Sequence, residues 1–159
     1  MTNGKHRVEA DAKARGLEVE FVALRGANGQ EPRSLEEAAA ALGIRPADIV
    51  KSLVVKRSDD TFLFALIPGD RSIAWAKLRA VVGVNKLQLP EALVALAATG
   101  YERGTITPLG STTAWPVFID QRVAGRRVSL GAGERGLSIF VDADSLVAAL
   151  GATVADISD

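Results

Sequence analysis

Two adjacent β-rich runs with a short polar segment between them restrict the fold of this chain more than any other feature. Residues 50–56 and 61–68 are dominated by β-branched and other apolar side chains, and the polar residues 57–60 separate them. Runs of this kind joined by a few polar residues predict a β-hairpin. The fold must therefore contain an antiparallel strand pair near the middle of the chain.

The rest of the chain alternates between further strands and helices. Ser34 and Glu37 have the spacing of a capping box, which opens a helix that runs to Leu42 and stops at Gly43. We also predict helices at 6–15, 46–48, 73–82, 90–98 and 145–150, strands at 17–23, 86–89, 116–120, 127–130 and 137–141, and a loop at 25–33. Thr99 and Gly100 are expected to close the helix at 90–98, and Asp142 or Asp144 to cap the helix at 145–150. Because no regular βαβ period appears, the pattern predicts a mixed α+β class. A length of 159 residues suits one domain, 1–159.

Composition excludes several kinds of chemistry. The chain has no cysteine, so disulfides, thiolate metal sites, iron–sulfur clusters and a cysteine nucleophile are excluded. The one histidine, His6, lies near a start that we expect to be frayed, which argues against a Ser-His-Asp triad or a histidine metal site. We therefore predict no cofactor and no metal. With no run of eighteen apolar residues and no secretory pattern, we expect no membrane contact and a cytoplasmic location.

Charge is balanced in total but unevenly distributed. The 19 Lys and Arg equal the 19 Asp and Glu, which excludes a polycation that holds nucleic acid by net charge alone. Residues 61–136 are nevertheless net basic and residues 137–159 net acidic. This asymmetry either marks a face for an anionic partner or is a chance pattern of solvated charges. The arginines that we expect near such a partner are Arg103, Arg122, Arg126, Arg127 and Arg135.

Two glycine-rich connections, residues 100–110 and 131–136, could approach a ligand with their backbone amides. Neither is a Walker loop, since no Gly-Lys-Ser/Thr follows. The second has G-x-G-x-x-G in letters, but it precedes a predicted strand rather than a helix, so a dinucleotide site is disfavoured. By themselves such loops are more often turns than sites.

Lys51 is the second candidate. In a strand it shares a face with Leu53 and Val55. A lysine on an apolar face is costly to bury unless an anionic or hydrogen-bonding group meets it. The alternative is that Lys51 extends its ammonium to water at the start of the strand, as surface lysines do.

Four ordered motifs carry a family resemblance. They are Val-Lys-Ser-Leu-Val-Val at 50–55, Thr-Gly-Tyr with Gly-Thr-Ile-Thr-Pro-Leu-Gly at 99–101 and 104–110, Phe-Ile-Asp at 118–120, and Gly-Glu-Arg-Gly-Leu at 133–137. Together they resemble the YbaK/EbsC family, free-standing relatives of the editing domain of bacterial prolyl-tRNA synthetases. The resemblance runs from about residue 17 to residue 157. It implies one compact α+β domain with a mixed, partly barrel-like sheet surrounded by helices.

The resemblance also implies a function. Members of this family deacylate mischarged tRNA at its acceptor end without a metal, and Cys-tRNA(Pro) is the expected substrate, or another small aminoacyl-tRNA. The prolyl-tRNA synthetase is a candidate partner. Lys51 and Gly104 would be the catalytic residues. The substrate-binding residues would be Gly100, Tyr101, Thr105, Ile106, Thr107, Pro108, Gly131, Gly133, Gly136 and Ser138.

Some positions depart from the family pattern. Ser138 stands where relatives commonly have an acidic residue, and Gly131 stands where they often have serine. These departures bear on which amino acid is chosen. Two other readings remain: a non-catalytic module that binds a nucleotide or aminoacyl ligand and docks on a synthetase, and a structural α+β domain without a site. Retention of both Lys51 and Gly104 favours the enzyme.

Overall fold

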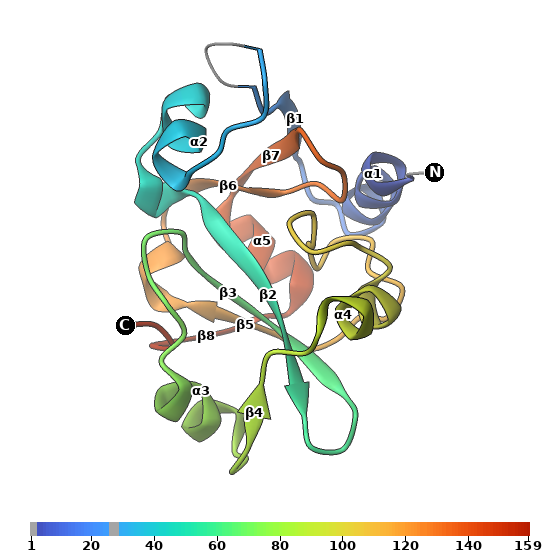
Figure 1. Ribbon diagram of the computed structural model, residues 1–159, viewed down its shortest axis with the longest axis vertical. Helices are drawn as coiled ribbons and strands as arrows, with labels where there is room; N and C mark the ends of the chain where they lie inside the picture. The colour runs from blue at the N-terminus through green and yellow to red at the C-terminus, as the bar shows by residue number, and fades with distance from the viewer. Residues whose placement is uncertain (1–2, 26–28) are drawn as a thin grey trace.

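The computed structural model describes residues 3–25 and 29–159. Its helices are α1 (Gly4–Ala14), α2 (Leu35–Leu42), α3 (Trp75–Val82), α4 (Ala92–Thr99) and α5 (Ala143–Leu150), with 3-10 turns at Pro46–Asp48 and Gln121–Val123. Its strands are β1 (Glu20–Ala23), β2 (Val50–Arg57), β3 (Phe62–Pro68), β4 (Leu87–Gln88), β5 (Val117–Asp120), β6 (Arg127–Gly131), β7 (Leu137–Asp142) and β8 (Thr153–Ala155). Figure 1 shows their arrangement.

The strands form two sheets that meet at the start of β2. One has the order β1-β7-β6 and the other the order β4-β2-β3-β5-β8. The predicted hairpin is confirmed, because β2 pairs with β3 in antiparallel register, with Lys51 opposite Ile67. Strand β5 is parallel to both β3 and β8, so the larger sheet is mixed. An isolated bridge from Ile49 to Ser129 joins the two sheets, and the predicted mixed α+β class is confirmed.

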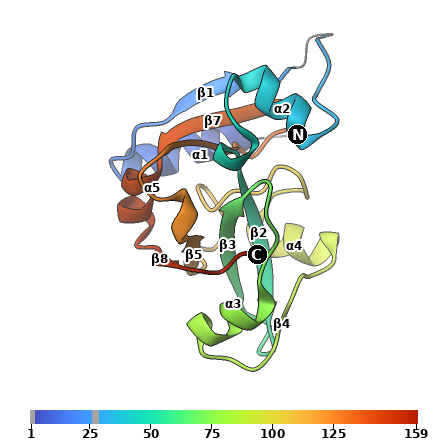
Figure 2. The same cartoon turned by 90° about the vertical axis from the view of Figure 1, so that its left-hand side faces the viewer.

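Two hydrophobic clusters cover the two faces of β3. Val54, Phe64 and Leu66 face a cluster that also holds Leu130 of β6 and Leu146 of α5. The alternate residues of the hairpin, with Leu63 and Ile67 among them, face a second cluster beneath Leu78 of α3. Every residue of β3 is buried as a result. Figure 2 shows α1, α2 and the smaller sheet at one end of the molecule, and α3 with β4 at the other.

Local signals account for most element ends. The Ser34 hydroxyl accepts a hydrogen bond from the Glu37 N–H at 3.0 Å, and Gly43 ends α2 with φ of +68°. Asp142 caps α5 in the same way, accepting from the Ser145 N–H. These contacts confirm the predicted caps.

Three details differ from the sequence predictions. Strand β1 covers only the second half of the predicted strand at 17–23, and α1 begins at Gly4, so His6 lies inside a helix rather than in a frayed end. Strand β8 was not predicted. Residues 26–28 of the predicted 25–33 loop lie outside the described residues. Within the described part of the chain, no helix is long and apolar enough to cross a membrane.

Candidate active site

Lys51 lies one residue into β2, with its side chain half-buried. Its ammonium donates a hydrogen bond to the Arg71 carbonyl oxygen at 2.7 Å. An ammonium has three N–H donors and no acceptor, so this contact leaves two donors for a ligand. The carbonyl offsets part of the cost of withdrawing the charge from water. The lysine is therefore anchored, and it is not the freely solvated surface residue of the alternative interpretation.

A cavity of about 310 Å³ opens beside this lysine, and we call it the Lys51 cavity. The start of β2, helix α2, strands β6 and β7 and the glycine loop after α4 contribute to its wall. Its lining residues are Leu24, Ala38, Leu42, Ile49, Val50, Lys51, Ser52, Leu53, Gly104, Ile106, Ser129, Leu130, Gly131, Leu137 and Ser138. Five of the predicted site residues, Lys51, Gly104, Ile106, Gly131 and Ser138, thus line one cavity. Lys51 is the only titratable side chain among these lining residues.

The loop around Gly104 presents its backbone to this cavity. Gly104 is exposed and has φ of +92°, a conformation that a side chain would strain. Within the described part of the chain, the Thr105 N–H donates to the Glu102 carbonyl at 3.0 Å, whereas the N–H groups of Gly104 and Ile106 have no acceptor. Two open backbone donors at a cavity are the kind of group that can bind a developing oxyanion.

Gly131 allows the β6–β7 connection to lie against this loop. A Cβ on Gly131 would lie 3.0 Å from the Ile106 carbonyl oxygen, closer than side-chain carbons normally come. The contact is completed when the Gly133 N–H donates to the Thr105 carbonyl at 3.0 Å. The two predicted glycine loops therefore pack side by side and share backbone hydrogen bonding.

Three hydroxyl groups lie on the wall of the Lys51 cavity. Ser138 is 4% exposed; its hydroxyl contacts the Ser129 hydroxyl and donates to the Leu130 carbonyl at 3.0 Å. Ser52 is different, because its buried oxygen has no hydrogen-bond partner among the described residues. A buried hydroxyl without a partner is destabilising unless a ligand or water meets it. Ser52 and Ser129 were missed by the sequence analysis, although Ser52 directly follows Lys51.

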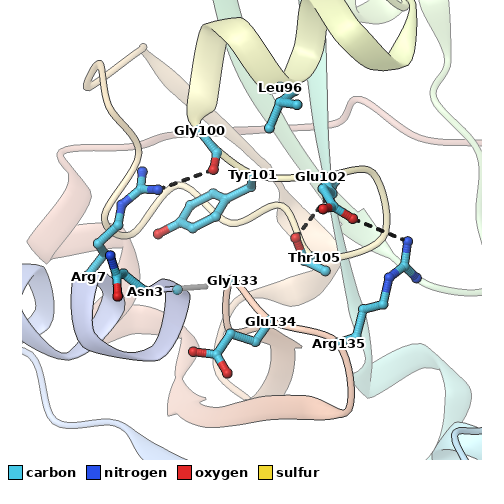
Figure 3. A pocket seen from close by; sticks show the side chains of 11 residues that line it. Asn3, Arg7, Leu96, Gly100, Tyr101, Glu102, Thr105, Gly133, Glu134 and Arg135 are labelled. Carbon is cyan, nitrogen blue, oxygen red and sulfur yellow. Dashed lines mark hydrogen bonds and ion pairs between the residues drawn. The ribbon is translucent and has the colours of Figure 1, made fainter. Parts of the chain in front are cut away.

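A second cavity of about 490 Å³, the Tyr101 cavity, contains four other predicted residues: Gly100, Tyr101, Thr105 and Gly133. Figure 3 shows that Leu96 of α4 lies above it and that Gly133, Glu134 and Arg135 of the β6–β7 loop lie below. Arg7 and Asn3 line the side formed by α1. The predicted site residues are thus divided between two neighbouring cavities.

Tyr101 itself is 2% exposed, and its hydroxyl donates to the Leu109 carbonyl at 2.7 Å. Burial raises the pKa of Tyr101 to about 12, against a smaller opposite effect of the Arg7 charge. The Arg7 guanidinium lies 4.3 Å from the centre of the ring. Tyr101 therefore supports the loop from within, and its neutral hydroxyl is already committed to the backbone.

The three remaining predicted residues line neither cavity. Thr107 is fully buried, and its hydroxyl accepts from the Leu109 N–H at 3.3 Å. Pro108 is buried beside a separate hollow next to Trp115. Gly136, with φ of +72°, turns the chain into β7, and its carbonyl accepts from the Leu24 N–H. A role for these residues in substrate binding remains a prediction.

Arg7 and Asp11 of α1 hold both ends of the glycine loop. The Arg7 guanidinium donates to the carbonyl oxygens of Thr99, Gly100 and Gly110. The Asp11 carboxylate accepts from the Gly110 N–H at 2.7 Å. No sequence pattern indicates a role for either residue, because their contacts lie about a hundred positions away in the chain.

A second set of polar contacts fixes the segment that anchors Lys51. Asp120 is fully buried, and its carboxylate accepts from the Ser158 hydroxyl at 2.7 Å, which in turn accepts from the Arg71 guanidinium at 2.9 Å. Burial opposes ionisation of Asp120, but the hydrogen bonds from Ser158 and from the backbone of Arg122 and Ile157 outweigh it and hold its pKa below the ordinary value. The Arg71 side chain is thus held by Ser158, while its backbone carbonyl accepts from Lys51.

Of the five arginines expected near an anionic partner, three are paired with carboxylates away from the cavities: Arg122 with Asp120 and Asp156, Arg126 with Asp48, and Arg127 with Glu20. Arg135 lies 3.6 Å from Glu102, in a pair with both side chains largely exposed. Arg103 is exposed and has no partner among the described residues.

Among residues 3–25 and 29–159, no group of three or more His, Cys, Asp or Glu side chains could hold a metal ion.

Comparisons with a family model, with relatives and with solved structures all point to the family that the sequence motifs resemble. Residues 30–149 match the family model of the aminoacyl-tRNA editing domain. EbsC of Enterococcus faecalis, a candidate Cys-tRNA(Pro)/Cys-tRNA(Cys) deacylase, is 27% identical over 126 residues, which are 79% of this chain and 77% of that protein. A proline–tRNA ligase of Thermosipho africanus is 40% identical over 79 residues, which are half of this chain but only 14% of the ligase.

A solved structure of a candidate trans-editing enzyme for prolyl-tRNA synthetase superimposes on the whole fold. Its TM-score is 0.88 at 27% identity, covering 100% of this chain and 99% of that one. The match to the family model extends over most of the residues that line the Lys51 cavity. The chain therefore belongs to the aminoacyl-tRNA editing domain family, and within it to the YbaK/EbsC group.

Proposed function

We propose that this protein hydrolyses the ester between a small amino acid and the terminal adenosine of a mischarged tRNA, with Cys-tRNA(Pro) as the first candidate substrate. The observation that carries the proposal is the Lys51 cavity, whose lining includes a lysine with an anchored ammonium and two residues with open backbone donors, Gly104 and Ile106. The reaction is acyl transfer to water. Family membership supports this reaction class and leaves the amino acid to be identified.

The chemistry requires little from side chains. A water molecule adds to the ester carbonyl carbon, and the negative charge that develops on the carbonyl oxygen is met by the N–H groups of the Gly104 loop. The bond to the ribose oxygen then breaks, and that oxygen takes the proton given up by the water. One such donor contributes about 3–4 kcal/mol to the transition state.

The role of Lys51 is to position the terminal nucleotide. Its two remaining N–H donors can reach ribose or phosphate oxygens as a compact positive charge. The serines that line the cavity have no imidazole or carboxylate among the other lining residues, so none is activated as a nucleophile. Hydrolysis without a protein nucleophile and without a metal is thus our proposal.

Cavity size favours a small aminoacyl group. A volume near 310 Å³ is at the lower end of the range of about 300–1,000 Å³ seen for small-molecule sites. Apolar side chains form much of the wall, and the unpartnered Ser52 hydroxyl offers one polar contact. We expect cysteinyl, alanyl or seryl esters to enter and aromatic ones to be excluded.

The deciding experiment is release of free amino acid from a panel of tRNAs by the purified protein. The panel holds Cys-tRNA(Pro), Ala-tRNA(Pro), a seryl and a phenylalanyl ester, and Pro-tRNA(Pro). We expect hydrolysis of at least one small mischarged ester and little of Pro-tRNA(Pro). Fastest hydrolysis of Pro-tRNA(Pro) would contradict editing, and binding without hydrolysis would favour the non-catalytic module.

The similarity to a segment of proline–tRNA ligases supports the proposal that the protein acts together with that synthetase, in the cytoplasm where tRNA is charged. Adding the synthetase to the assay tests the partnership, which predicts a higher rate at the same tRNA concentration.

A further inference from the structure

The two cavities share one wall. Gly104 and Ile106 line the Lys51 cavity, whereas Thr105, between them, lines the Tyr101 cavity. The Gly133 N–H bound to the Thr105 carbonyl completes the wall from the other loop. Since Gly104 is exposed and carries no side chain, an extended ligand can cross the wall at this point. A polymer whose end occupies the Lys51 cavity can thus continue into the Tyr101 cavity.

Uncommitted positive charge gathers at this crossing. A Cβ on Gly104 would lie 3.9 Å from Nη1 of Arg135, so the guanidinium stands directly beside the glycine. Its pair with Glu102 spans 3.6 Å with exposed fractions of 63% and 65%, and pairs of this kind contribute little. Arg103 precedes Gly104 and has no partner among the described residues. Arg135 can therefore exchange a weak ion pair for a phosphate here, and Arg103 supplies a second positive charge one residue before Gly104.

We propose that the Tyr101 cavity binds the nucleotide that precedes the terminal adenosine of an RNA acceptor end, while Arg103 and Arg135 bind the phosphate between the two nucleotides. The proposal rests on the proposed function, because it requires the aminoacyl end to occupy the Lys51 cavity. It adds a nucleotide site to the one that holds the ester.

The lining of the Tyr101 cavity suits a cytosine. Glu134 is committed to the Lys5 backbone N–H at 2.8 Å, so Glu102 is the available carboxylate once Arg135 turns to a phosphate. A carboxylate accepts well from the exocyclic amino group of cytosine, whereas uracil presents a carbonyl oxygen at the same position. Leu96 offers apolar surface for the flat face of the base. A cytidine stands at this position in the tRNA acceptor end.

The first test measures binding without catalysis. An unacylated RNA hairpin ending in CCA, labelled at its 5′ end, is titrated with protein by fluorescence anisotropy at several salt concentrations. Arg103→Ala and Arg135→Ala should each weaken binding on the order of tenfold and lower the slope of log K against log salt by about 0.7. The control is Arg127→Ala, because Arg127 pairs with Glu20 and lines neither cavity.

Equal effects of all three substitutions, or no effect of any, would overturn the phosphate assignment. Because Arg103 and Arg135 are exposed, their loss should not disturb folding, and a thermal melt checks this.

The second test concerns the base. Replacing the cytidine before the terminal adenosine by uridine should weaken binding to the wild-type protein several-fold, because the carbonyl oxygen of uracil cannot donate to the Glu102 carboxylate. Glu102→Gln should remove most of that discrimination, because an amide can serve either base. Equal affinity of the wild type for the two hairpins would overturn the cytosine site.

The outcomes separate this inference from the proposed function. If Lys51→Ala abolishes deacylation but the arginine variants bind the hairpin as the wild type does, only the nucleotide site is wrong. If the arginines bind the hairpin but no ester is hydrolysed, the nucleotide site stands and the deacylase proposal fails.

Discussion

Substitution of Gly104 by alanine separates a role in the turn from a role at the ester. The φ angle of +92° imposes a backbone cost of about 1–2 kcal/mol on any residue with a side chain. The space itself is open, since the nearest heavy atom to the added Cβ would be Arg135 Nη1 at 3.9 Å. For a domain of this size such a loss lowers the melting temperature by about 2–8 °C. The protein should therefore still fold.

Activity should fall much further than stability. The new methyl group stands where the substrate must approach the backbone. If it keeps the ester carbonyl oxygen out of reach of one backbone donor, kcat falls by roughly 10²–10³-fold, as it does when such a donor is removed. Gly125→Ala is the matched control, because Gly125 has φ of +76°, has nothing within 4 Å of an added Cβ, and lines neither cavity.

The assay compares thermal melts and single-turnover deacylation for both variants. We expect similar melting temperatures for the two, with wild-type turnover for Gly125→Ala and a large loss for Gly104→Ala. If both variants melt alike and hydrolyse the ester at the wild-type rate, Gly104 serves only the turn and the reasoning is refuted.

Three further substitutions test other parts of the site. Lys51→Ala should abolish deacylation with a small change in melting temperature, while Lys56→Ala on the same strand, whose partner Asp60 is exposed, should leave turnover unchanged. Ser138→Asp should change the ratio of kcat/KM between cysteinyl and alanyl esters, because Ser138 lies on the cavity wall; an unchanged ratio would place it outside the selective contacts. Asp120→Asn should lower the free energy of unfolding by about 3 kcal/mol at pH 7, since it removes a buried charge from its donors. Because the pKa of Asp120 is depressed in the folded protein, its contribution is present above the ordinary carboxyl value of about 3.9 and is lost as pH falls through the lower folded value. Urea unfolding across pH 2–7 should therefore show a weaker acid dependence for the variant than for the wild type.

Local patterns were sufficient for most of the fold. The hairpin, the Ser34 cap and the glycine stops at Gly43 and Gly100 depend on residues within a few positions of each other, and all were predictable. Strand β8 was missed because Thr153–Ala155 is short, mostly exposed, and becomes a strand only by pairing with β5. A three-residue strand carries too little periodicity to be recognised alone.

Residue type alone did not identify the site, because a lysine in a strand and a glycine in a loop are more often a surface residue and a turn. The family resemblance singled out Lys51 and Gly104, and these two residues line the same cavity, whereas their roles stay predictions. Tyr101 looked like a binding residue, yet its hydroxyl is bound to the Leu109 carbonyl inside the core. Which side of a loop faces a ligand depends on tertiary packing, and a sequence pattern does not contain it.

The two ends of the described chain converge on the candidate site, and this bears on the proposal that residues 1–159 work as one domain. From one end, Arg7 donates to the carbonyl oxygens of Thr99 and Gly110, and Asp11 accepts from the Gly110 N–H. Residues 99 and 110 flank the Gly104 loop. From the other, Ser158 links buried Asp120 to Arg71, whose carbonyl receives the Lys51 ammonium. A site that binds a transition state by position alone requires its groups to be held before the substrate arrives. Contacts distant in sequence hold the ends of the Gly104 loop and the Lys51 ammonium. We therefore expect the proposed deacylation to depend on α1 and on the segment after β8 as well as on the residues that line the cavity.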